Sequence, residues 1–69
     1  MKWYVIKSAN GNVEVASEWN NLNSAKVAYH DLCKVFWNSP DVLDGVIAIV
    51  DSHLELVEPY KEYIHHEAS

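Results

Sequence analysis

Residues 2–19, "KWYVIKSANGNVEVASEW", contain the signal that decides the fold. Two segments rich in β-branched and aromatic residues flank the dipeptide Asn10-Gly11. Asn-Gly is the strongest short-range signal for a β-hairpin, because both central residues of a type I′ turn need positive φ. The chain is therefore predicted to begin with two antiparallel strands, over residues 2–8 and 12–19.

The position of this turn fixes a register for the hairpin, and the register predicts how each face is composed. One face is apolar, and the other is more apolar than a solvent-facing surface should be, although it carries a pair of unlike charges. The predicted pairs are Ser8–Val13, Lys7–Glu14, Ile6–Val15, Val5–Ala16 and Tyr4–Ser17. The first face carries Tyr4, Ile6, Val13 and Val15, and the second carries Trp3, Val5, Lys7, Glu14 and Ala16.

A helix is predicted next, within "NNLNSAKVAYHDLCKVFWNSP" at residues 20–40. Asn21 or Asn23 supplies the N-cap, and residues 38–40 end the helix. Trp37 projects toward the polar side at the last turn, so we expect it to be partly exposed. Apolar residues recur at spacings of three and four and form one stripe, which consists of Ala25, Ala28, Tyr29, Leu32, Val35 and Phe36.

The remaining residues predict two more strands and a possible short helix. Residues 46–50, "VIAIV", form an apolar run typical of a central strand buried on both faces. In residues 54–58, "LELVE", Leu54 and Leu56 alternate with Glu55, which indicates a half-buried edge strand. Pro59 is tolerated at a helix start, and three apolar residues follow at i, i+3 and i+4, which favours a helix over 59–66.

Together these elements predict a single α+β domain over residues 1–69, of the order ββαββ, with residues 65–69 as a frayed tail. The sheet has four antiparallel strands in the order 2-1-3-4, with the helix on one face. We expect the other face, which carries Trp3, Val5 and Ala16, to need a cover. The C-terminal segment, a second copy of the chain or another protein would provide it.

Length and composition limit the functions that the chain can have. A domain of 69 residues buries only roughly 60% of the surface of its unfolded chain, which makes a deep catalytic cleft improbable. The single cysteine, Cys33, excludes an intrachain disulfide and favours a cytoplasmic protein. The longest apolar run near the N-terminus, residues 3–6, is too short for a signal peptide or a membrane span, so no membrane association is expected.

The charge distribution argues against direct binding of nucleic acid. The net charge is −5 and the chain contains no arginine, the usual bidentate ligand of phosphate and guanine. The acidity lies mainly in residues 41–69, where seven carboxylates accompany the single cation Lys61. This pattern fits a solvated surface, and it also fits a surface that meets a basic partner.

Neither the histidines nor the cysteine predict a catalytic or metal site, and no cofactor is expected. The stretch "EYIHHE" contains His65 and His66, but adjacent residues of a helix point about 100° apart and cannot share a metal ion. Cys33 and His30 lie within one helical turn, yet a thiol in mid-helix at the edge of an apolar stripe is normally a small core residue. The chain is therefore expected not to be an enzyme.

The aromatic residues are a more informative set. Trp and Tyr are enriched at protein interfaces, and several of them lie outside or at the rim of the predicted apolar stripes. Stacking on single-stranded nucleic acid would need a basic groove, which the composition does not offer. The candidate interface residues are Trp3, Val5, Trp19, Trp37, Tyr60, Tyr63 and Ile64.

The layout also resembles a loose group of proteins, through the segments "KWYVIKSANGNVEV", "NSAKVAYHDLCKVF" and "VIAIVDSHLELVEPYKEYIHHE". These segments are similar to those of small uncharacterised proteins of Firmicutes phages, prophages and gut bacteria, which open with a W-Y-V-type strand and end in an aromatic tail. His53-Leu54 stands where such proteins typically have a glycine turn. The resemblance implies the fold and a phage or bacterial setting, and it implies no catalytic residues.

Three classes of function follow from these observations. The first is a non-enzymatic module that binds protein or self-associates as a homodimer, with a phage-related accessory role. The second is an acidic inhibitor that binds a basic host protein by imitating nucleic-acid charge. The third, a small metal- or thiol-dependent enzyme, would require metal bound to the histidines or a reactive Cys33.

Overall fold

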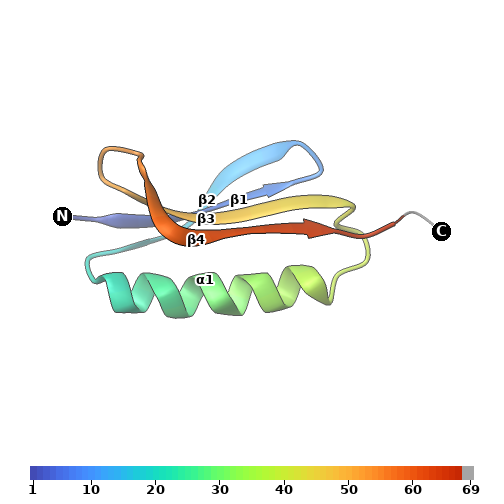
Figure 1. Cartoon of the computed structure of the whole chain (residues 1–69), viewed down its shortest axis with the longest axis horizontal. Coiled ribbons are helices and arrows are strands. Elements are labelled where there is room, and N and C mark those ends of the chain that lie inside the picture. The colour runs from blue at the N-terminus through green and yellow to red at the C-terminus, as the bar shows by residue number, and fades with distance from the viewer. Residues whose placement is uncertain (68–69) are drawn as a thin grey trace.

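The computed structural model describes residues 1–67 and shows an α+β fold with one sheet and one helix (Figure 1). The elements are β1 (Trp3–Ala9), β2 (Asn12–Trp19), α1 (Leu22–Trp37), β3 (Asp44–Asp51) and β4 (Leu56–His65). The strands form an antiparallel sheet in the order β2-β1-β3-β4. Strand order, strand direction and the single covering helix were all predicted from the sequence, and all three are confirmed.

The β1–β2 hairpin turns at Asn10 and Gly11, whose φ values are 50° and 91°. Three predicted pairs, from Ser8–Val13 to Ile6–Val15, are present in the structure. Beyond them the prediction is wrong, because the register shifts between Val5 and Ile6 and leaves Ala16 without a partner. This β-bulge moves the rest of β2 by one residue, so the final pairs are Val5–Ser17, Tyr4–Glu18 and Trp3–Trp19.

Helix α1 begins and ends where its capping residues predict. The side chain of Asn21 accepts hydrogen bonds from the backbone N–H groups of Asn23 and Ser24, at 2.7 and 3.2 Å. The N–H of Asn38 donates to the carbonyl of Lys34 and closes the last turn. The predicted stripe needs one correction, because Val35 is 56% exposed whereas Cys33 is buried.

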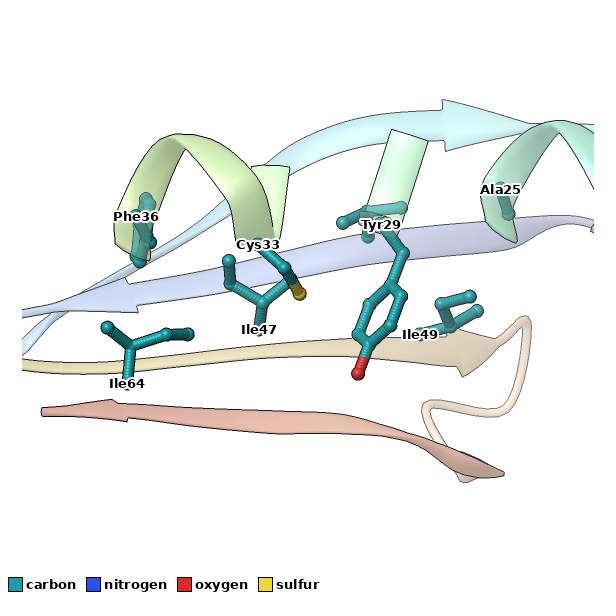
Figure 2. Close-up of a cluster of buried hydrophobic side chains, with 8 residues drawn as sticks. Ala25, Tyr29, Cys33, Phe36, Ile47, Ile49 and Ile64 are labelled. Carbon is teal, nitrogen blue, oxygen red and sulfur yellow. The ribbon is translucent and has the colours of Figure 1, made fainter. Parts of the chain in front are cut away.

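The core lies between α1 and one face of the sheet. Figure 2 shows Tyr29, Cys33 and Phe36 directed from the helix toward Ile47 and Ile64 of the sheet. The helix thus covers one side of the sheet, and no other described segment covers the opposite side (Figure 1). The buried cluster consists of Val5, Ala25, Tyr29, Cys33, Phe36, Ile47, Ile49 and Ile64.

The predicted edge strand is present as β4, but it covers residues 56–65 rather than 54–58. The helix predicted over 59–66 is wrong, because residues 59–65 continue this strand. Leu54 instead lies in the preceding turn, with φ 62°. Residues 61–65 of β4 pair with β3, and this pairing places Ile64 fully inside the core. A two-turn helix at this position would be marginally stable alone. The β3–β4 register shifts between Ala48 and Val50, next to the segment that contains Pro59.

Candidate protein-interaction surface

The face of the sheet opposite α1 is the leading candidate for a functional surface. Period-two alternation, interrupted by the register shifts in β2 and β4, directs part of each strand to this side. The pairing aligns these residues in three rows across four strands. We call this surface the open face. Its rows are Tyr63–Val46–Ser8–Val13, Lys61–Ala48–Ile6–Val15 and Leu56–Val50–Tyr4–Glu18.

The open face is apolar at its centre and charged only at its margins. Val13 and Val15 are 70% and 58% exposed on the edge strand β2. Lys61 lies on the opposite edge strand, and Glu18 at one corner forms an ion pair with Lys2. A central apolar area with a polar rim is the usual composition of a protein interface.

The sequence predicts the wrong face for the helix. It places the uncovered face at Trp3 and Val5, but Val5 is 0% exposed beneath α1, and Trp3 packs against the same core. All five residues of the run 46–50 are apolar, so their alternation cannot choose between the two faces. The helix covers the face with the larger aliphatic groups, including Ile47 and Ile49, because their burial removes more apolar surface from water. Because the helix covers only this face, β3 is fully buried on one side, and the prediction that it is buried on both sides is wrong.

The seven predicted interface residues separate into buried and exposed groups. Val5 and Ile64 are fully buried, and Trp3 and Tyr60 are half-buried against the core. The Tyr60 ring packs edge-on against Tyr29, with a centroid distance of 5.8 Å. Trp19, Trp37 and Tyr63 remain exposed, as expected for Trp37, but only Tyr63 lies on the open face. The sequence prediction does not include four residues of this face among the interface candidates. It groups them as an apolar set but places that set beneath the helix: Tyr4, Ile6, Val13 and Val15.

Tyr63 is held at one corner of the open face by a hydrogen bond to Asp44. The Tyr63 hydroxyl donates to Asp44 Oδ1 at 2.9 Å, and His65 Nδ1 lies 3.1 Å from the same oxygen. These bonds from Tyr63 and His65 lower the pKa of the Asp44 carboxyl, and the bond to Asp44 raises the pKa of the Tyr63 phenol. The hydrogen bond to Asp44 therefore restricts the orientation of the Tyr63 ring.

His66 connects the end of β4 to the end of α1. Its Nδ1 lies 2.8 Å from the Val42 carbonyl and its Nε2 lies 3.0 Å from the Trp37 carbonyl. The Trp37 ring packs edge-on against His66, and its indole N–H donates to Glu62 Oε2 at 3.1 Å. The frayed tail over 65–69 stays a prediction: His65 ends β4, His66 makes the contacts above, and residues 68 and 69 lie outside the described part of the chain.

Cys33 is a free cysteine that is buried in the core. Burial raises the pKa of the Cys33 thiol, so this buried group stays protonated near neutral pH. Within residues 1–67, no three histidine, cysteine or carboxylate side chains are grouped closely enough to hold a metal ion. Over the same residues, no helix is long and apolar enough to cross a membrane.

No family model matches this chain, and no curated protein or solved structure is significantly similar to it. Function is therefore inferred from the geometry of the chain itself.

Proposed function

We propose that the chain is a non-enzymatic, cytoplasmic protein-binding module that self-associates through the open face, with an accessory role in a phage or bacterial setting. One observation carries this proposal: a four-stranded sheet has an apolar surface, with Val13, Val15 and Tyr63 each more than half exposed, on the side that lacks a helix. Exposed apolar patches of this kind are typical of interaction sites.

A second copy of the chain is the simplest cover for this surface. In a two-fold arrangement the same patch serves both partners, so each apolar row meets another apolar row about 10 Å away between packed sheets. Three rows on four strands span about 20 Å by 20 Å, on the order of 400 Å² for each partner. The total of about 800 Å² lies below the usual range of stable interfaces, so we expect weak, reversible association rather than an obligate dimer.

The test is the molar mass in solution over a concentration series, measured for the whole chain and two matched variants. Val15→Lys adds a charge to the open face, whereas Val35→Lys adds the same charge to the outer surface of α1 at nearly the same exposure, 58% against 56%. We expect the parent chain to rise from 7.9 kDa toward twice that mass. Val35→Lys should follow it, and Val15→Lys should stay monomeric.

High salt provides an independent check, because apolar association survives it while charge-driven association does not. A parent chain that remains monomeric at millimolar concentration, or a Val15→Lys variant that dimerises like the parent, would contradict the proposal. Trp3 and Val5 are unsuitable test positions, because a charge there would disrupt the core.

A second candidate function is an acidic inhibitor that binds a basic host protein. The exposed carboxylates Asp41, Glu55, Glu58 and Glu67 form no ion pair within the described residues, so their charge is available to a partner. This function predicts binding to a basic protein that weakens steeply as salt rises, with the chain itself monomeric.

A further inference from the structure

A groove lies between the end of β2 and the outer surface of α1, in a different part of the molecule from the open face. Its volume is about 310 Å³, within the range of small ligand sites. The lining residues come from one strand and from the first three turns of one helix. They are Trp19, Ser24, Val27, Ala28 and Asp31, and this set will be called the Trp19 groove.

The aromatic wall of the groove is held in place by its own hydrogen bond. The indole N–H of Trp19 donates to Ser17 Oγ at 2.8 Å. This bond occupies the only polar group of the Trp19 side chain, so the ring itself remains available for contacts. About a third of the residue is exposed. Tryptophan is the best of the aromatic side chains at attracting a cation to its ring face.

The groove combines this ring with an apolar lining and one negative charge. Asp31 is the only ionisable residue of the lining, and within residues 1–67 it forms no ion pair with Lys34, one turn further along α1, or with any other cation. Val27 and Ala28 supply the apolar surface, and Ser24 supplies a hydroxyl that accepts hydrogen bonds.

We propose that the Trp19 groove binds a lysine side chain presented by a partner protein. The lysine stem would lie along Val27 and Ala28, and the ammonium group would reach Asp31 next to the Trp19 ring. A lysine side chain matches each part of the lining. Its ammonium group offers three donors to the Asp31 carboxylate and the Ser24 hydroxyl, and its methylene groups match the apolar residues. An acidic or neutral polar side chain would leave the aromatic ring or the carboxylate without a partner.

The probe is Nα-acetyl-lysine methylamide, which keeps the side-chain ammonium group. It is titrated into the ¹⁵N-labelled whole chain while the Trp19 indole and Val27 amide resonances are followed. N-acetyl-norleucine methylamide, which has a similar stem without the charge, is the matched control ligand. We expect saturable shifts with the lysine probe, with a dissociation constant on the order of 1 mM for a single side chain. The norleucine probe should bind several-fold more weakly.

Two carboxylate variants test the role of charge. Asp31→Asn should weaken binding of the lysine probe about two- to fivefold, as for loss of one exposed ion pair. Asp41→Asn changes the net charge equally but lies outside the groove, and should leave binding unchanged. Trp19→Leu should reduce affinity by a similar factor, through loss of the cation–π contact.

Equal binding of the norleucine probe would overturn this proposal, as would the absence of saturable shifts or equal effects of Asp31→Asn and Asp41→Asn. The outcome is independent of self-association. Val15→Lys alters only the open face, so it should retain the response to lysine whether or not the parent chain dimerises.

Discussion

At the scale of single residues, Leu54 is the clearest local conflict between sequence and backbone. Its φ of 62° lies in the left-handed region, which costs a residue with a side chain roughly 1–2 kcal/mol, and its side chain is 73% exposed. We expect Leu54→Gly to increase the free energy of unfolding by about 0.5–1 kcal/mol, since the relief of strain exceeds the entropic cost of glycine. Urea unfolding measures the change. Leu54→Ala keeps the strain, and a comparable gain there would show that removal of the exposed leucine is responsible.

Gly45 shows the opposite situation, in which a glycine is required by packing. A Cβ atom at this position would lie 2.8 Å from Val42 Cγ1 and 2.9 Å from Phe36 Cδ2. We expect Gly45→Ala to reduce the free energy of unfolding by about 1–3 kcal/mol, because the Phe36 ring must shift within the core. The measurement is urea unfolding of this variant alone and combined with Phe36→Leu. Strictly additive effects of the two substitutions would argue against the clash.

At the scale of elements, Asn10 links the β1–β2 hairpin to the loop between α1 and β3. Its side-chain oxygen accepts from the N–H groups of Leu43 and Asp44 at 2.9 and 3.1 Å, and its Nδ2 donates to the Asp41 carbonyl at 2.9 Å. The sequence predicts Asn10 as a turn residue, and local spacing holds no signal for partners more than thirty positions away.

We expect Asn10→Gly to destabilise the fold by about 1–2 kcal/mol, although glycine adopts the positive φ of this turn without strain. The turn itself should persist, while the Leu43 and Asp44 amides lose protection from hydrogen exchange. Unchanged protection at both amides would show that the three side-chain bonds do not hold the loop.

The helix was predictable because its signals are local, whereas the full length of β4 was not. Asn21 caps α1 through a direct bond to its own next turn, so sequence spacing alone contains that interaction. In β4 the residues that face the helix are Tyr60, Glu62 and Ile64. The charged Glu62 interrupts the alternation of apolar and polar residues by which a strand is recognised in a sequence. On that side the Glu62 carboxylate accepts a hydrogen bond from Trp37, twenty-five residues earlier. Such a contact exists only after folding.

At the scale of the whole molecule, the candidate site was only partly predictable. The apolar hairpin set Tyr4, Ile6, Val13 and Val15 follows from the Asn-Gly turn, but its exposure depends on which face the helix covers. The covered face is set by the total apolar surface that each face can bury. That total includes Ile64, which lies in the part of β4 that the sequence assigns to a helix. The Trp19 groove likewise depends on the bulge at Ala16, which shifts Trp19 by one position along β2.

The buried phenol of Tyr29 should contribute to the loss of stability of the whole molecule at alkaline pH. Burial raises the pKa of Tyr29 to about 12, with a further contribution from Cys33, whereas an unfolded tyrosine ionises near pH 10. The contribution of the neutral phenol is complete below pH 10. Between pH 10 and 12 the unfolded chain releases this proton and the folded chain retains it. Stability should therefore fall as pH rises through that window, by at most about 1.4 kcal/mol per pH unit from this group.

Tyr29→Phe removes this ionisation while keeping the ring in the core, so we expect its free energy of unfolding to decline less between pH 10 and 12 than that of the parent. Urea unfolding followed by circular dichroism at several pH values measures the difference. Tyr63→Phe is the matched control, because the raised pKa of that exposed phenol comes from its bond to Asp44 rather than from the core. If Tyr63→Phe flattens the decline as much as Tyr29→Phe, surface charge rather than core burial sets the alkaline limit of the fold.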